Sequence, residues 1–165
     1  MIVVSDATPL RHLIAIGKAD LLRVLFGTVI VPSAVLAELR HHSSPVVVRE
    51  WVDWLPVWVE TRSPRDSQLP AGANALDAGE KEAISITLEL KADLLLIDER
   101  AGREYALMLH LPVTGTLGIL ERADVESLLP NLPETLAELE VSGFYLSGRL
   151  RDAVLGRYKQ RRGIT

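Results

Sequence analysis

The run Ala92-Asp93-Leu94-Leu95-Leu96-Ile97-Asp98, residues 92–98, gives the clearest indication of fold class in this chain. A short apolar run that ends in an acid and leads into a helical pattern is typical of a strand in a β/α unit, because both faces of a parallel sheet are covered. Residues 2–6, Ile2-Val3-Val4-Ser5-Asp6, repeat the arrangement. The two runs together predict a buried parallel sheet.

Outward from these runs, apolar strand patterns alternate with amphipathic helical ones. Further strands are expected at Thr28–Val31 and Leu111–Thr114, with a weaker fifth candidate at Pro56–Glu60. Helices are expected at Pro9–Ile16, Asp20–Phe26, Ser33–His42, Val46–Trp54, Ala78–Leu90, Arg100–Leu109 and Thr116–Arg122. Alternation of this kind predicts an α/β fold.

The domain organisation follows from length and from the C-terminal pattern. The chain has 165 residues, 48% of them hydrophobic, which is enough for one substantial core. No strand pattern recurs after residue 129, and Pro133–Glu140 with Gly148–Arg161 predict two helices. We therefore expect one domain over residues 1–165 with a C-terminal helical extension from about residue 130. The Pro- and Gly-containing stretch Thr61–Ala75 is expected to be a surface loop.

Composition excludes several classes of protein. The chain has no cysteine, so disulfides and thiolate metal sites are impossible and a reducing compartment fits best. The first residues lack the features of a secretory signal, and no apolar run approaches the ~20 residues of a membrane span. The glycine patterns of dinucleotide-binding and P-loop proteins are also missing. These features predict a cytoplasmic protein with no membrane partner.

Charge is unevenly distributed along the chain. The net charge is -4, yet basic residues gather near the C-terminus with only Asp152 among them. They are Arg149, Arg151, Arg157, Lys159, Arg161 and Arg162. Such a segment either contacts nucleic-acid phosphates or forms a solvated helix face, and both interpretations stay open.

Two acids, Asp6 and Asp98, directly follow the two strongest strands. Open α/β sheets bind their ligands outside the carboxyl ends of the strands, so both acids are candidates for a functional site. The alternative is that each caps the helix that follows. For Asp6 the sequence Thr8-Pro9 predicts another N-cap and a proline at the first helical position, which favours a functional role. For Asp98 both roles stay open.

Two further acids, Glu38 and Glu80, lie on predicted helices. Glu38 borders the apolar stripe of its helix, although a glutamate there is also commonly exposed. Glu80 shares its helical stripe with Ala83 and Ile84, whereas Glu82 points more outward. Asp77 and Glu80 also form a capping-box pattern, so capping competes with a site role for Glu80.

Convergence of these carboxylates would imply a metal. Clustered carboxylates repel one another unless cations neutralise them, and oxygen ligands suit Mg2+ or Mn2+. The adjacent pair His41-His42 does not have the spacing of a zinc site. An oxygen-only site of one or two ions suits phosphodiester hydrolysis by an activated water.

At this point the sequence resembles the PIN-domain nucleases, and in particular the VapC-like toxins of toxin-antitoxin modules. The likeness is carried by residues 3–10 (VVSDATPL), 31–39 (VPSAVLAEL), 76–84 (LDAGEKEAI) and 92–100 (ADLLLIDER). Residues 114–118 (TGTLG) and 142–147 (SGFYLS) are similar to a less characterised PIN-like branch.

The resemblance implies a site, a fold and partners. It matches Asp6, Glu38, Glu80 and Asp98 to the four metal-site acids of a ribonuclease that cleaves single-stranded RNA. It also implies a three-layer α/β/α fold with five parallel strands in the order 3-2-1-4-5, a homodimer and a cognate antitoxin protein.

The sequence departs from the common family pattern at three positions. Glutamate stands for aspartate at position 80, Ala7 replaces a hydroxyl residue, and Ile97 replaces a threonine. Thr8, or less strongly Thr116, is expected to supply the missing hydroxyl beside the metal ligands. The open alternative is a PIN-like module that binds RNA or a protein without cutting.

Overall fold

Five short strands form one parallel sheet in the computed structural model, which describes residues 1–164. The strand order β3-β2-β1-β4-β5 confirms the predicted order. The strands are β1 (Val3–Ser5), β2 (Val29–Pro32), β3 (Val59–Arg62), β4 (Leu94–Leu96) and β5 (Val113–Thr114). The weakest prediction, Pro56–Glu60, is shifted, because a turn closed by the hydrogen bond from Val59 N to Pro56 O precedes β3.

The register of the central strands brings their carboxyl ends to one edge. Ser5 of β1 pairs with Leu96 of β4, and Leu96 pairs with Thr114 of β5. Asp6 and Asp98, which follow β1 and β4, therefore leave the sheet at the same edge. This edge is where the candidate site lies.

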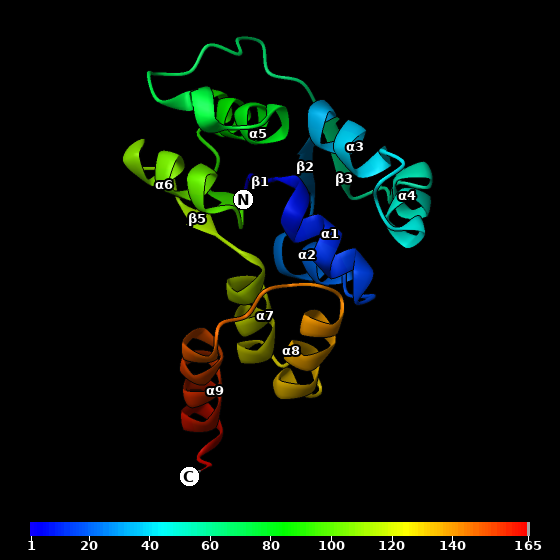
Figure 1. Cartoon of the computed structure of the whole chain (residues 1–165), viewed down its shortest axis with the longest axis vertical. Coiled ribbons are helices and arrows are strands. Elements are labelled where there is room, and N and C mark those ends of the chain that lie inside the picture. Colours follow the sequence, from blue (N-terminus) through cyan, green and yellow to red (C-terminus); the bar gives the residue numbers. More distant parts are fainter. Residues whose placement is uncertain (165) are drawn as a thin grey trace.

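Helices cover both faces of the sheet, because successive strand residues point to opposite sides. Val3 and Leu96 face one core, and Val4 and Leu95 face the other. The first core is lined by α1 (Ala7–Ala15), α2 (Asp20–Phe26), α3 (Ser33–Arg40), α4 (Val46–Asp53) and α7 (Thr116–Val125). The second is lined by α5 (Ala78–Leu90) and α6 (Arg100–Met108). The three-layer α/β/α prediction is thus confirmed, with α5 and α6 on the opposite side of the sheet from α1 and α7 (Figure 1).

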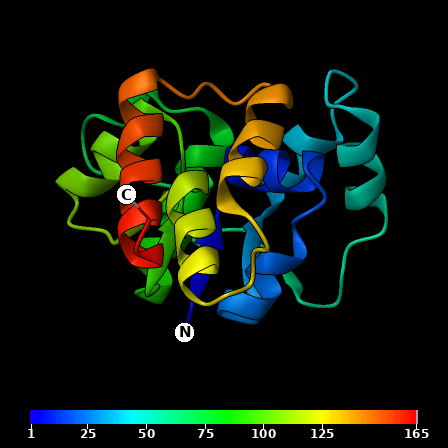
Figure 2. The same ribbon diagram turned by 90° about the horizontal axis from the view of Figure 1, so that it is seen from below.

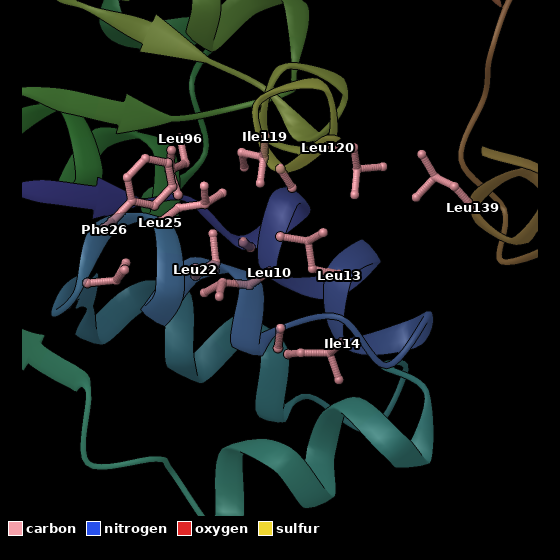
Figure 3. Close-up of a cluster of buried hydrophobic side chains, with 14 of the residues drawn as sticks. Leu10, Leu13, Ile14, Leu22, Leu25, Phe26, Leu96, Ile119, Leu120 and Leu139 are labelled. Carbon is pink, nitrogen blue, oxygen red and sulfur yellow. The ribbon is translucent and has the colours of Figure 1, made fainter. Parts of the chain in front are cut away.

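The first core is built mainly from leucines of the helices. Figure 3 shows Leu10 of α1 and Leu22 of α2 in the same cluster as Leu96 of β4 and Ile119 of α7. All four side chains are fully buried. Burial of such a side chain contributes about 1.5–3 kcal/mol, so this core holds α1 and α7 against the sheet.

The C-terminal part consists of α8 (Leu132–Val141) and α9 (Gly148–Arg162), close to the predicted helices. Leu132, Leu136 and Leu139 of α8 join the first core, whereas only Val154 of α9 is fully buried. Instead, α9 lies beside α7 in both views (Figures 1 and 2) and is attached to it by ion pairs.

Most arginines of the basic C-terminal segment are paired within the chain. Nη2 of Arg157 lies 2.6 Å from Glu121, and Nη2 of Arg161 and Nη2 of Arg162 lie 2.9 and 2.8 Å from Asp124. Arg151 pairs with Glu140 of α8. The basic segment therefore attaches α9 to its neighbours.

The connection between β3 and α5 is mainly irregular, as expected for residues 61–75, and holds one short 3-10 turn, η1 (Ala73–Ala75). Among residues 1–164, no helix combines the length and apolar character that crossing a bilayer requires.

Candidate functional site

Asp6 stands at the junction of β1 and α1. Its backbone N donates to Leu96 O at 2.8 Å, and α1 begins at the next residue, Ala7. The expectation that Thr8 caps this helix with Pro9 at its first position is therefore wrong, since Pro9 is its third residue. Asp6 occupies the N-cap position in extended conformation, yet its side chain makes no capping hydrogen bond. Its carboxylate is available for another contact.

The Asp6 carboxyl is buried among other acids. The residue is 2% exposed, and among the described residues its Oδ1 has no hydrogen-bond partner. Burial raises the pKa of Asp6 to about 7, the carboxylates of Asp77, Glu80 and Glu38 act in the same direction, and the backbone N–H of Ala7 opposes them. A buried carboxylate without a partner is costly, and a bound cation would remove that cost.

Glu38 of α3 approaches Asp6 across the first turn of α5. A Cβ placed on Gly79 would lie 3.2 Å from Oε2 of Glu38 and 3.4 Å from Oδ1 of Asp6. The two carboxylates therefore border the same small space, which glycine leaves open. Nη2 of Arg11, on α1, lies 3.3 Å from Oε1 of Glu38 and supplies a positive charge at this position.

Glu80 has both features that the sequence suggested. The capping box is present: Asp77 N donates to Oε2 of Glu80 at 2.9 Å, and Glu80 N donates to Asp77 at 2.8 Å. Glu80 is also only 4% exposed, and burial is the main cause of its raised pKa. Its Oε1 faces α6, where a Cβ on Gly102 would lie 3.1 Å away. Glu82 points elsewhere, and accepts from Ala34 N of α3.

Asp98 caps a different helix from the one considered in the sequence. The N-cap residue of α6 is Glu99, and the Asp98 side chain reaches α7 instead. Thr116 donates to it twice, from N to Oδ1 at 2.8 Å and from Oγ1 to Oδ2 at 2.6 Å. Asp98 is half-buried and is not among the charges that raise the pKa of Asp6 or Glu80.

The two hydroxyl candidates differ in their surroundings. Thr116 is fully buried and holds the Asp98 carboxylate, as described above. Thr8 is half-exposed, and its Oγ1 lies 3.4 Å from Oε1 of Glu99, a long contact to an exposed acid. The structure thus brings Thr116, and not Thr8, into contact with one of the four acids.

The acids near Asp6 are Glu38, Glu80 and Asp77. Asp77 was interpreted from the sequence only as a helix cap, although its place three residues before Glu80 already indicated that the two carboxylates are neighbours. Within residues 1–164, no three acids or histidines are placed to hold one ion as they stand. The unpartnered Oδ1 of Asp6, the open space at Gly79 and the all-oxygen donor set nevertheless fit a hard divalent cation.

A parallel sheet covered by helices on both faces, with carboxylates at the carboxyl edge of its central strands, defines an α/β protein with an acidic candidate site. The sequence matches the family model DUF3368, described as a PIN domain, over residues 2–160, and the chain belongs to this less characterised branch of the PIN-domain proteins. PIN domains are generally nucleases. No curated protein and no solved structure matches the chain.

Proposed function

We propose that this PIN-domain protein is a Mg2+- or Mn2+-dependent endoribonuclease that cleaves single-stranded RNA. The observation that supports it most is the buried Asp6 carboxylate, which ends the central strand, has an unpartnered oxygen among the described residues, and faces Glu38 across Gly79. Burying a carboxylate beside other acids is costly unless the group is protonated or a cation compensates its charge, and an ion would let Asp6 stay charged at neutral pH.

Asp6, Glu38 and Glu80 would hold the ion, with Asp98 as the fourth acid of the site. When bound, a divalent ion supplies the Lewis acidity that activates a water and neutralises charge on the phosphate. The other residues position these groups. Thr116 fixes both oxygens of Asp98, and Arg11 places a guanidinium beside Glu38.

Cleavage of a labelled single-stranded RNA tests the proposal. The wild type should cut with Mg2+ or Mn2+ and not with EDTA, and Asp6→Asn and Asp98→Asn should each lower the rate at least 100-fold while circular dichroism shows a folded protein. Asp152→Asn, an exposed acid on α9, is the matched control and should cut normally. Undiminished cleavage by both site variants contradicts the assignment.

The biological setting that we propose is a toxin-antitoxin module. The VapC-like motifs support a toxin that acts in the cytoplasm as a homodimer and is silenced by a cognate antitoxin. Induced expression should then arrest growth, and Asp6→Asn should relieve the arrest. Light scattering of the purified protein should give twice the mass of the 18.2 kDa chain. Growth unaffected by the wild type argues against the toxin role.

A second candidate function is a PIN-like module that binds RNA or a protein without cutting. Its supporting observation is that one oxygen of Glu80 and both oxygens of Asp98 already accept hydrogen bonds in the chain. Calorimetric titration with Mn2+ separates the two functions. The nuclease should bind the ion and lose binding on Asp6→Asn, whereas the module should show no binding that this substitution removes.

A further inference from the structure

We propose that the groove beside the acids binds a base of single-stranded RNA next to the cleavage site, with Tyr145 as its stacking platform and Arg103 as a phosphate contact. This inference rests on the proposed function, because it takes RNA as the substrate. It gives a role to residues 142–147, which the metal site does not use.

The groove shares one acid, Asp98, with the candidate site. It has a volume of about 720 Å³ and lies between the carboxyl edge of the sheet and the connection from α8 to α9. Thr8 and Asp98 line it at the sheet edge, and Phe144 and Tyr145 line it at the C-terminal side. A chain bound at Asp98 therefore lies at the mouth of the groove.

The segment that carries Tyr145 is anchored on both sides. Gly143 has a φ of +104°, which turns the chain out of α8 in a conformation that favours glycine. The ring of Phe144 packs edge-to-face on His12 of α1, with centroids 4.9 Å apart, and Leu146 is buried in the first core. Tyr145 is 85% exposed between these two fixed neighbours.

An exposed aromatic ring on a fixed segment suits base stacking. Proteins recognise single-stranded RNA mainly by stacking unpaired bases on aromatic side chains, and little ordering cost remains when the ring is already positioned. Each such contact is worth about 1–3 kcal/mol. Phe144 is not available in this way, because it is half-buried against the first core and its ring contacts His12.

A cation for the phosphate, Arg103, also lines the groove. Nη1 of Arg103 donates to Ile97 O at 2.9 Å, and in the described part of the chain Arg103 has no acidic partner within ion-pair distance. A Cβ on Gly115 would lie 3.2 Å from that Nη1 and 2.5 Å from Oδ1 of Asp98. Arg103 therefore stands beside the acid edge with guanidinium N–H groups left for a phosphate.

The other two arginines of the groove are already paired. Arg100 pairs with Glu104, and Arg157 pairs with Glu121. Arg103 and Tyr145 are thus the arginine and the exposed ring that remain for a ligand, and their chemistry suits a nucleotide, with an anionic phosphate and a flat base. An acidic segment of a protein partner would use Arg103 but does not need Tyr145 as a stacking surface.

Equilibrium binding of a fluorescent single-stranded RNA, followed by anisotropy with Ca2+ in place of Mg2+, tests the inference. Tyr145→Ala should weaken binding by about tenfold, and Tyr145→Phe, which keeps the ring, should bind within about twofold of wild type. Trp54→Ala is the matched control, because Trp54 is 86% exposed and lies outside the groove. Arg103→Gln should lower the salt dependence of log K by about 0.7, the value for one phosphate of a single strand.

The outcomes distinguish this inference from the nuclease proposal. If the wild type cleaves RNA and Tyr145→Ala binds and cleaves equally well, the groove inference is overturned and the nuclease assignment stands. If no variant cleaves but binding still depends on Tyr145, the nuclease assignment fails and the groove inference stands. The groove inference is also overturned if Tyr145→Ala loses a protein partner but keeps its affinity for RNA. It is overturned as well if the wild type does not bind RNA.

Discussion

Asp6 opposes folding of the metal-free protein at neutral pH, which follows from its burial. Its pKa is about 7 in the folded chain, against an ordinary value of 3.8. Between these values the folded protein holds a proton that the unfolded chain releases. The burial of Asp6 therefore carries no ionisation penalty on folding below about pH 4. The penalty grows as pH rises to 7 and is complete above it.

Asp6→Asn removes this penalty and should stabilise the metal-free protein at pH 8. We expect a gain of up to about 4 kcal/mol in EDTA, at 1.36 kcal/mol for each pH unit between the two pKa values. The gain should shrink toward pH 4, and thermal unfolding in EDTA across this range measures it. A variant that is less stable than wild type at pH 8 contradicts the expectation. With Mn2+ the order should reverse, because only the wild type gains stability from the ion.

Substitution of Arg11 should change metal affinity in the opposite direction to substitution of Asp6. Its guanidinium pairs with Glu38 at 3.3 Å and competes with an ion for that carboxylate. Arg11→Ala should therefore tighten Mn2+ binding several-fold, whereas Asp6→Asn should abolish it; titration calorimetry distinguishes these directions. Arg40→Ala, which removes an arginine paired with Asp53 of α4, is the matched control and should leave the affinity unchanged.

At the scale of elements, the first turn of α5 combines a helix cap with a candidate ligand, and substitution can separate the two. Glu80→Gln keeps an acceptor for Asp77 N, so unfolding temperature should stay within a few degrees, but loss of the charge should weaken Mn2+ binding at least tenfold. Asp77→Ser keeps an N-cap and removes the neighbouring charge, so its effect on metal affinity should be smaller. If Glu80→Gln leaves Mn2+ affinity unchanged, Glu80 is only a cap.

The elements themselves were largely predictable from local pattern, but their contacts were not. Apolar runs located the strands, and α5 has the bounds that its periodicity predicted. The start of α1 was missed because Pro9 suits more than one position in a first turn. The capping of α7 by Asp98 was missed because Thr116 is 18 residues away, and local rules do not register such a partner.

At the scale of the whole molecule, the C-terminal helices complete the groove, so its walls depend on how α9 is attached. Because α9 buries little apolar surface, its position relies on its ion pairs, and the most buried acid among them is Asp124 of α7, whose side chain is 1% exposed and accepts from both Arg161 and Arg162. Hydrogen bonds to a charged group contribute about 1.5–3 kcal/mol each, which is large for one helix on a surface.

Asp124→Asn should therefore loosen α9 without unfolding the sheet. Amide hydrogen exchange across residues 148–162 should speed up by about tenfold or more, corresponding to a loss of at least about 1.4 kcal/mol of local stability. Protection of β1 and β4 should not change, because their core does not depend on this pair. Asp152→Asn, an exposed acid on α9 itself, is the control and should exchange as wild type. If the groove wall on α9 supports RNA binding, Asp124→Asn should also weaken RNA affinity, while Mn2+ affinity at Asp6 persists. Equal loss of RNA affinity and Mn2+ affinity would point instead to general unfolding.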